Sequence, residues 1–407
     1  MIRPLVVVPT RNRASLARAA ITSVLGQVAD GHILVSDNST DTAEVEELAR
    51  FCAGMDPATV TYVRPSQPLP MTAHWQWALQ RGLQRPGLTH VLYLTDRMVF
   101  KQGALRHLLD LTNHHPDRVI SYNHDRIDDF ARPVRLEQRD WTGSLFMVPS
   151  GHLLNLTARA IVPPCLPRML NCIAPVKTLA QLERRFGGVF SSASPDYAFA
   201  YRLLATVDGI LYWDASPLIH YALDRSNGAS LARGIASKDS LDFIANLDNT
   251  TANAAAPVPA FRTATNPIFH EYGVVRAQVG GLPQIDRFQY LGMMDFDCRQ
   301  LRDPSTARAM SSLLRAQGWN ARRRAIWVLQ RLLPYVRHDP TGALSGALRR
   351  APAFDDALAA IDYADRHPRP PRPRAQHFYL WPLTHPPTAV REVQAAGSMA
   401  APVSRAA

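Results

Sequence analysis

Short apolar runs alternate with stretches of helical periodicity along the N-terminal part of the chain. Four runs of four or five residues read as strands, and the apolar runs at 5–8 and 91–95 indicate strands buried on both faces. They cover residues 5–8, 32–35, 59–63 and 91–95. Helices are predicted over residues 14–27, 41–52 and 71–82. Strands that alternate with helices at about thirty residues per unit predict an α/β fold, with a Rossmann-type, mostly parallel sheet flanked by helices.

Three of the predicted strands end in clusters of polar residues, at 10–13, 36–38 and 96–97. Ligands of open α/β sheets bind beyond the carboxyl ends of the strands, so these clusters are expected to converge into one crevice of nucleotide size. The first turn reads PTRNRAS, which is neither a glycine-rich dinucleotide fingerprint nor a Walker phosphate loop. Phosphates would therefore need side-chain donors, and Arg11, Arg13 and Arg97 are the candidates.

Five segments resemble, in this order, the motifs of the family-2 glycosyltransferases, which are inverting enzymes with the GT-A fold. They are VVVPTRNRASLARAAITSVLGQ, ILVSDNSTD, MTAHWQWAL, LYLTDRMVF and SPDYAFAYRLL. The resemblance covers a little over half the chain and fades after about Ser230. It implies that Pro9 and Thr10 hold the base and ribose of a nucleotide sugar. It also implies that Asp37 contacts the base and that Asp96 holds the ribose and a divalent metal.

The acidic motif departs from the family pattern, which offers two or three carboxylates. Asp96 is followed by Arg97 and Met98, and a hard cation such as Mg²⁺ or Mn²⁺ wants several oxygen ligands. Two alternatives stay open: Asp96 holds the ion together with His220, or the Arg97 guanidinium replaces it. The resemblance puts His220 roughly where relatives direct a His or Arg toward the diphosphate. Arg225, in the turn that follows, is a further candidate for a phosphate contact.

Asp196 is the candidate catalytic base. Pro195 marks a helix start and puts Asp196 in the first turn, where the helix dipole alone already favours an acid. The resemblance adds the catalytic role, because the family places its base before an aromatic-rich helix that ends in Arg, as Tyr197 and Arg202 do here. Inverting transfer needs a carboxylate that takes the proton of the acceptor hydroxyl and a positive charge that stabilises the leaving diphosphate.

Two further segments of this region have both a functional and a structural interpretation: the acidic run could ligate a metal, and the two tryptophans of the 71–82 helix could stack on a base or sugar. The acidic run at residues 124–129 is predicted to be a solvated turn rather than a metal site. Trp75 and Trp77 cannot share one helix face, so one of them is expected in the core.

The sequence changes character after residue 235. We expect a GT-A-like domain over residues 1–235, a mainly helical extension over 236–365, and a Pro-, Ala- and Arg-rich tail over 366–407 with too few core residues to fold. One helix is predicted over 307–333, with arginines beside Ile326, Trp327, Leu329 and Leu332. Such a basic amphipathic helix either lies on an anionic membrane or packs on the catalytic domain.

Composition and charge narrow the compartment and the partners. The four cysteines form no CxxC pair, the N-terminus lacks a signal peptide, and no apolar run could cross a bilayer, so we expect a cytoplasmic protein. The net charge of +11 favours anionic partners, including a peripheral contact at the inner face of the membrane. No RNA-recognition signature or zinc finger is present, and no nucleic acid is expected.

The sequence thus predicts an inverting glycosyltransferase, with a nucleotide-sugar donor and a glycan or lipid-linked acceptor, in the synthesis of cell-envelope or exported polysaccharide. Two rival functions share this fold class. A nucleotidyltransferase would carry a glycine-rich loop after the first strand, which PTRNRAS is not. A non-catalytic protein that binds a nucleotide sugar or a glycan is the other alternative, and the reduced acidic motif favours it.

Overall fold

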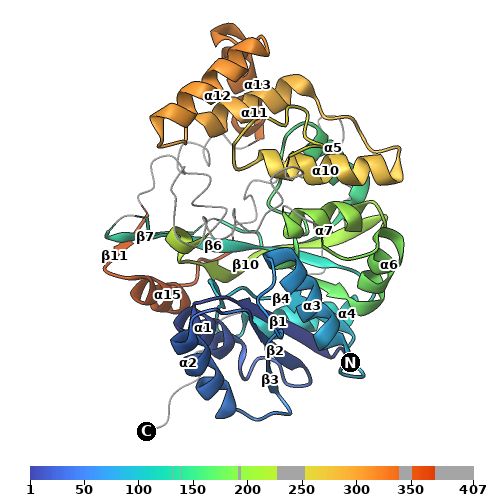
Figure 1. The fold of residues 1–407 in the computed structure, drawn as a ribbon, viewed down its shortest axis with the longest axis vertical. Helices are drawn as coiled ribbons and strands as arrows, with labels where there is room; N and C mark the ends of the chain where they lie inside the picture. The colour runs from blue at the N-terminus through green and yellow to red at the C-terminus, as the bar shows by residue number, and fades with distance from the viewer. Residues whose placement is uncertain (131, 139, 191–193, 227–252, 339–350, 372–407) are drawn as a thin grey trace.

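The computed structural model describes residues 1–130, 132–138, 140–190, 194–226, 253–338 and 351–371. These residues form an α/β fold around a sheet of eleven strands, with a helical C-terminal region above it (Figure 1). The sheet order is β11-β7-β6-β9-β4-β1-β2-β3, and β10 joins it through β5, β6 and β8. The predicted α/β class with a helical C-terminal region is confirmed.

The N-terminal half alternates strands and helices as predicted. Its elements are β1 (Pro4–Thr10), α1 (Ala14–Val24), β2 (His32–Asp37), α2 (Thr42–Ala53), β3 (Val60–Val63), α3 (Met71–Leu83) and β4 (His90–Tyr93). Strands β4, β1, β2 and β3 lie side by side and pair in parallel. The register sets Thr10 beside Asp37 and Val7 beside Tyr93. Thr10 and Asp96, each three residues further on, therefore reach the same edge of the sheet.

The second half adds strands of both directions. Its elements are β5 (Met98–Phe100), α4 (Ala104–His114), β6 (Ile120–Asp128), β7 (Val134–Glu137), β8 (Leu145–Pro149), α5 (Ser150–Ala158), η1 (Met169–Asn171), β9 (Cys172–Pro175), α6 (Val176–Phe186), α7 (Pro195–Leu204), β10 (Gly209–His220) and η2 (Leu223–Arg225). Strand β10 is parallel to β6 and antiparallel to β5 and β8. This pairing brings His220 opposite Met98, at the end of the sheet that carries Asp96.

The predicted turn over residues 124–129 is wrong. Most of this run belongs to β6, and Asp125 is buried against the Lys101 ammonium at 2.6 Å. The Asp129 carboxylate accepts hydrogen bonds from the backbone N–H groups of Leu223 and Asp224. Partners distant in the sequence thus supply the hydrogen bonds that water was expected to give.

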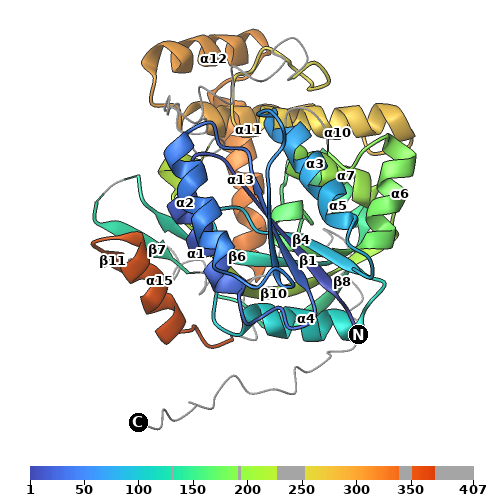
Figure 2. The same cartoon turned by 60° about the horizontal axis from the view of Figure 1, so that its bottom comes forward.

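Two cores cover the two faces of the sheet. Side chains of α1, α2 and α4 pack on one face, and those of α3, α5, α6 and α7 on the other; Figure 2 shows α1 and α2 across the strands from α3, α6 and α7. Trp75 of α3 is buried, with ring centroids 5.4 Å from Tyr93 and 5.6 Å from Phe190. Trp77 is only half-buried. The expected division between the two tryptophans is confirmed.

The C-terminal region contains α10 (Asn266–Val279), α11 (Arg287–Cys298), α12 (Pro304–Ala316) and α13 (Ala321–His338), followed by β11 (Ala353–Phe354) and α15 (Ala357–Arg366). Helix α10 packs on α7, whereas α11, α12 and α13 share a core of their own. Strand β11 returns to the sheet and pairs with β7. The single helix predicted over 307–333 is wrong, because Gly318, with φ +76°, ends the turn after α12 and starts a new direction.

The remaining predictions concern the tail, the domain boundaries, the cysteines and membrane-spanning helices. The predicted tail is described only to residue 371, and residues 372–407 lie outside the described part of the chain. The boundaries at 235 and 365 remain predictions. All four cysteines are buried and unpaired. Among the helices that the structure describes, none combines the length and the apolar character needed to cross a bilayer.

Candidate functional site

A buried hydrogen bond joins the ends of β1 and β4. The Thr10 hydroxyl donates to Asp96 Oδ2 at 2.9 Å, and both residues are nearly inaccessible to solvent. Backbone pairing continues to the next strand, where the Asn38 N–H donates to the Thr10 carbonyl at 3.0 Å. The three strand-end clusters that the sequence singled out therefore meet along one edge, as expected from the parallel pairing.

Two arginines face this carboxylate and a third is hydrogen-bonded to one of them; we call Arg13, Arg97 and Arg225 the arginine cluster. Arg13 Nη1 lies 3.4 Å and Arg97 Nε 3.9 Å from Asp96 Oδ1. Arg13 also donates to the Arg225 carbonyl at 2.7 Å, and Arg225 donates to the Asn12 carbonyl at 3.1 Å. One buried carboxylate thus faces more than one guanidinium, and the site has an excess of positive charge suited to a polyanion.

Arg97 contacts His220 as well as Asp96. Arg97 Nη1 lies 2.9 Å from His220 Nε2. Because Arg97 can only donate, His220 Nε2 accepts, and the ring proton resides on Nδ1. Burial, the Arg97 charge and neighbouring His124 hold the pKa of His220 well below its usual value, so the imidazole is neutral. Its neutral form is the one that can orient the guanidinium.

The PTRNRAS turn is organised by Asn12, which sequence reasoning did not single out. Asn12 has φ +54°, a conformation that asparagine tolerates better than most residues. Its Oδ1 accepts from the N–H groups of Thr40 and Asp41, and its own N–H donates to Ser39 Oγ at 2.7 Å. An asparagine in a turn between two strand ends was the available signal.

The starts of α1 and α2 are held by acidic residues of the second helical unit. Asp41 caps α2 by accepting a hydrogen bond from the Ala43 N–H. Glu44, in the first turn of α2, accepts the Ala14 N–H at the start of α1. A residue of α2 thereby fixes the helix that follows Arg13. Arg11 is held separately, with Nη1 3.5 Å from the Leu69 carbonyl.

Asp37 is buried behind this turn. Its Oδ1 accepts the Ser39 N–H at 2.8 Å, and its Oδ2 accepts the Tyr62 hydroxyl at 2.7 Å. The side chain has no exposed surface. Asp37 therefore orders the end of β2 in this structure, and a base could reach it only after a local rearrangement. The contact between Asp37 and a base stays a prediction.

Asp196 lies in the first turn of α7, where Pro195 starts the helix as predicted. Burial raises the pKa of its carboxyl, while the Arg168 charge and backbone N–H groups of the first turn act in the opposite direction. Nearby, Arg168 lies over the Tyr197 ring, 5.6 Å from its centroid, and Glu271 of α10 accepts the Ser194 N–H at 2.9 Å. A carboxyl with a raised pKa beside a cation suits proton transfer.

Arg168 lies beside Tyr197 in this site and was not singled out from the sequence. Its charge lowers the pKa of Asp196 and that of His220. Arg168 itself contacts Tyr197, the neighbour of Asp196 in α7, with Nη1 3.4 Å from the Tyr197 hydroxyl. Arg168 follows a proline-rich segment that contains no recognised motif, so the sequence pattern did not mark it as a site residue. Arg202, matched to the family by sequence, instead donates to the carbonyls of Gly188 and Phe190 at 2.9 Å and has a structural role.

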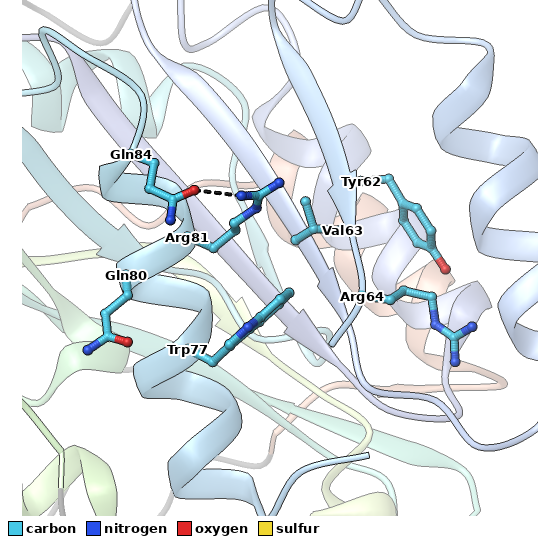
Figure 3. A pocket seen from close by; sticks show the side chains of 7 residues that line it. All are labelled: Tyr62, Val63, Arg64, Trp77, Gln80, Arg81 and Gln84. Atoms are coloured by element: carbon cyan, nitrogen blue, oxygen red, sulfur yellow. Dashed lines mark hydrogen bonds between the residues drawn. The ribbon is translucent and has the colours of Figure 1, made fainter. Parts of the chain in front are cut away.

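A polar pocket of about 460 Å³ lies at the edge of the sheet between β3 and α3. Figure 3 shows Trp77 and Arg81 directed from α3 toward Val63, with Tyr62 and Arg64 on the other side of the strand. The pocket adjoins Asp37, since Tyr62 donates to that carboxylate and Arg64 Nε lies 3.8 Å from it. It contains none of the residues of the arginine cluster.

The donors at Asp96 and His220 are a poor match for a divalent ion. Asp96 already accepts from Thr10 and faces two guanidinium groups, and the His220 lone pair at Nε2 is directed at Arg97. Within the described residues no three His, Cys, Asp or Glu side chains gather closely enough to hold an ion. Mg²⁺ and Mn²⁺ prefer several oxygen ligands, so this arrangement of residues does not fit them.

Comparison with known proteins finds similarity only to solved structures. No protein-family model and no curated protein matches the chain. It is similar to S. aureus TarS, with 12% identity and a TM-score of 0.41 over 76% of this chain, and it spans about half of that protein (55%). It is also similar to TarS 1–349 in complex with UDP-GlcNAc (14% identity, TM-score 0.40, 81% of this chain and 92% of that one). For the complex with UDP the values are 13%, 0.43, 79% and 93%. Likeness at this level assigns neither a family nor an activity.

Proposed function

We propose that this chain is an inverting glycosyltransferase of the family-2, GT-A type, which transfers a sugar from a nucleotide sugar to an acceptor hydroxyl. One observation carries the proposal: Thr10, Arg13 and Arg97 meet at Asp96 beyond the strand ends, and His220 of β10 contacts Arg97. Arg97 is the candidate cation for the leaving group, and Asp196, beside the Tyr197 ring that Arg168 contacts, is the candidate base. The five sequence motifs, in the family's order, support the same function.

The nucleotide sugar would bind at the strand ends, with its diphosphate at the arginine cluster. Arg97 presents a forked donor, its side chain is still 13% exposed, and His220 fixes its orientation. The leaving diphosphate gains negative charge as the glycosidic bond breaks, and a preorganised guanidinium stabilises that charge. Since Asp96 and His220 do not fit a divalent ion, the proposal assigns this role to Arg97 and requires no metal.

Asp196 would act as the base. The acceptor oxygen attacks the anomeric carbon and forms the new C–O bond, while the bond to the diphosphate oxygen breaks on the opposite side and the anomeric configuration inverts. The proton of the acceptor hydroxyl passes to the Asp196 carboxylate. A carboxyl whose pKa is raised by burial is a stronger base than an exposed one, and a positioned base contributes typically about 10²–10⁴-fold.

The acceptor is proposed to be a glycan or a lipid-linked saccharide of the cell envelope or of an exported polysaccharide, as the family resemblance implies. A non-catalytic binding protein is the second candidate. The observation that favours it is Asp96, whose oxygens are already engaged by Thr10 and Arg13. Such a protein would bind a nucleotide sugar at the arginine cluster and release no product from it.

Binding and turnover separate these two functions. A thermal-shift screen of nucleotide sugars, with and without EDTA, should find a donor that raises the melting temperature in both conditions, because a ligand of the native state stabilises it. With that donor and a glycan acceptor, the enzyme should release free nucleoside diphosphate and give a product of inverted anomeric configuration. A stabilising donor without release would favour the binding protein, and a product of retained configuration would contradict the proposed mechanism.

A further inference from the structure

Helix α13 turns one side to the protein, and its other side is not covered by the residues that the structure describes. Trp327 is buried in the core that α13 shares with α11 and α12, close to Gly292 of α11. Arg324 and Arg331 lie on the same side: Arg324 bonds the Asp295 carboxylate at 2.7 and 2.8 Å, and Arg331 donates to the Ala160 carbonyl at 2.7 Å. The side of α13 that faces the protein is therefore fixed by these three residues.

The opposite side of α13 is a continuous apolar stripe in solvent. At 100° per residue, its members fall on one half of the helix, away from Trp327. Their side chains are between 40% and 59% exposed. The stripe consists of Ile326, Val328, Leu329, Leu332 and Leu333. These are five of the eight large apolar side chains that are exposed in the described residues, so their concentration on one helix is a property of this helix.

The stripe lies in the most basic part of the chain. Residues 287–338 contain ten arginines, no lysine, three aspartates and no glutamate, a net +7 of the total +11. The three aspartates are used internally: Asp295 pairs with Arg299 and Arg324, Asp297 accepts from Thr265, and Asp303 caps α12. Arg322, at the start of α13, is exposed and falls on the same half of the helix as the stripe.

We propose that the exposed face of α13 docks on an anionic lipid bilayer, with the five apolar side chains at the level of the acyl chains and Arg322 at the headgroups. Apolar insertion combined with arginines at the acidic surface is the mode by which amphipathic helices bind such membranes. A second copy of the chain is a weaker fit. Stable dimers bury roughly 20–30 residues a side, and two copies of the segment 287–338, each of net charge +7, repel each other.

Vesicle sedimentation with the full chain tests this surface. The protein should sediment with vesicles of phosphatidylglycerol and phosphatidylcholine at low salt, bind phosphatidylcholine alone far less, and be released as salt rises, because exposed charges are screened. Leu329→Ser combined with Leu332→Ser should weaken binding at least about tenfold, since two apolar side chains lose their insertion. Arg322→Glu should weaken binding at low salt only.

Matched controls lie elsewhere on the molecule. Leu358 of α15 is 65% exposed, and Arg184 of α6 is an exposed arginine outside the basic region. Leu358→Ser and Arg184→Glu should leave vesicle binding unchanged. Absence of binding at low salt would overturn the proposal, as would equal losses in these controls. A concentration-dependent dimer that Leu329→Ser dissolves, without vesicle binding, would assign the stripe to a second copy instead.

Discussion

Arg97 Nη1 lies 2.9 Å from His220 Nε2, although 123 residues separate the two in sequence. Strand β10 makes this contact possible, because it pairs with β5 and returns His220 to the end of β4. Arg97, which stands where the family's acidic motif has a carboxylate, is held in a fixed orientation by this contact with His220. A neutral histidine that can only accept is a suitable partner for an arginine that can only donate.

Replacement of Arg97 tests its role toward the leaving group. Arg97→Ala should lower kcat by about 10²–10³-fold with little change in folding, because one preorganised donor to the growing charge is lost. Arg97→Lys keeps the charge without the fork and should recover only part of the rate. The steady-state rates of both variants, compared with Arg184→Ala as a control, measure this. A kcat of Arg97→Ala within a few-fold of wild type would remove Arg97 from the mechanism.

The pH dependence should report Asp196 and not His220. The base must be deprotonated to act, and burial raises the pKa of Asp196, so kcat/KM should fall with decreasing pH at a point above the usual aspartate value of about 3.9. Since the pKa of His220 lies well below about 6.5, no limb near that pH should come from it. The profile of His220→Gln measures this. It should keep the acid limb of the wild type, and a limb that disappears in this variant would assign the ionisation to His220.

Thr10 should contribute to stability through its hydrogen bond to Asp96. Thr10→Val keeps the shape but leaves a buried carboxylate oxygen without its donor, and the free energy of unfolding should fall by about 1.5–3 kcal/mol. Thr10→Ser keeps the hydroxyl and should lose less. Urea unfolding followed by tryptophan fluorescence compares the two. A valine variant as stable as wild type would mean that the bond makes no net contribution.

Gly292 should be required for the packing of α11 against α13. A Cβ at this position would lie 2.3 Å from the Trp327 ring, so Gly292→Ala must displace the indole and should cost about 1–3 kcal/mol. Gly151, a helical glycine of α5 with no atom within 4 Å of such a Cβ, is the control, and Gly151→Ala should be neutral or slightly stabilising. Hydrogen exchange of α11–α13 distinguishes them. Equal protection in both variants would contradict the described packing.

The parallel half of the sheet could be predicted because β1, β2 and β4 are buried along their whole length and contain continuous apolar runs. The meeting of Thr10 with Asp96 followed from the same pattern, since both residues end neighbouring parallel strands. The start of α7 was also predictable, because Pro195 fixes it locally. These predictions needed only short-range rules.

Other features depended on contacts that no local pattern encodes. The run at 124–129 is polar yet belongs to a strand, because Lys101 and the N–H groups of η2 lie beside it. Arg168 reaches Asp196 only through the path of the loop after α5. The outward side of α13 could not be told from its inward side until Trp327 was placed against Gly292. In each case tertiary packing decides between two readings that the sequence allows.

The rate of nucleoside diphosphate release in EDTA most directly tests whether Asp196 and Arg97 support transfer without a metal. With a stabilising donor and an acceptor, the wild type should release diphosphate at the same rate in EDTA as with added Mn²⁺. Asp196→Asn should still bind the donor, but it should release nucleoside diphosphate at least about 10²-fold more slowly in both conditions. A wild type that is inactive in EDTA and restored by Mn²⁺, or an Asp196→Asn variant near the wild-type rate, would contradict the account.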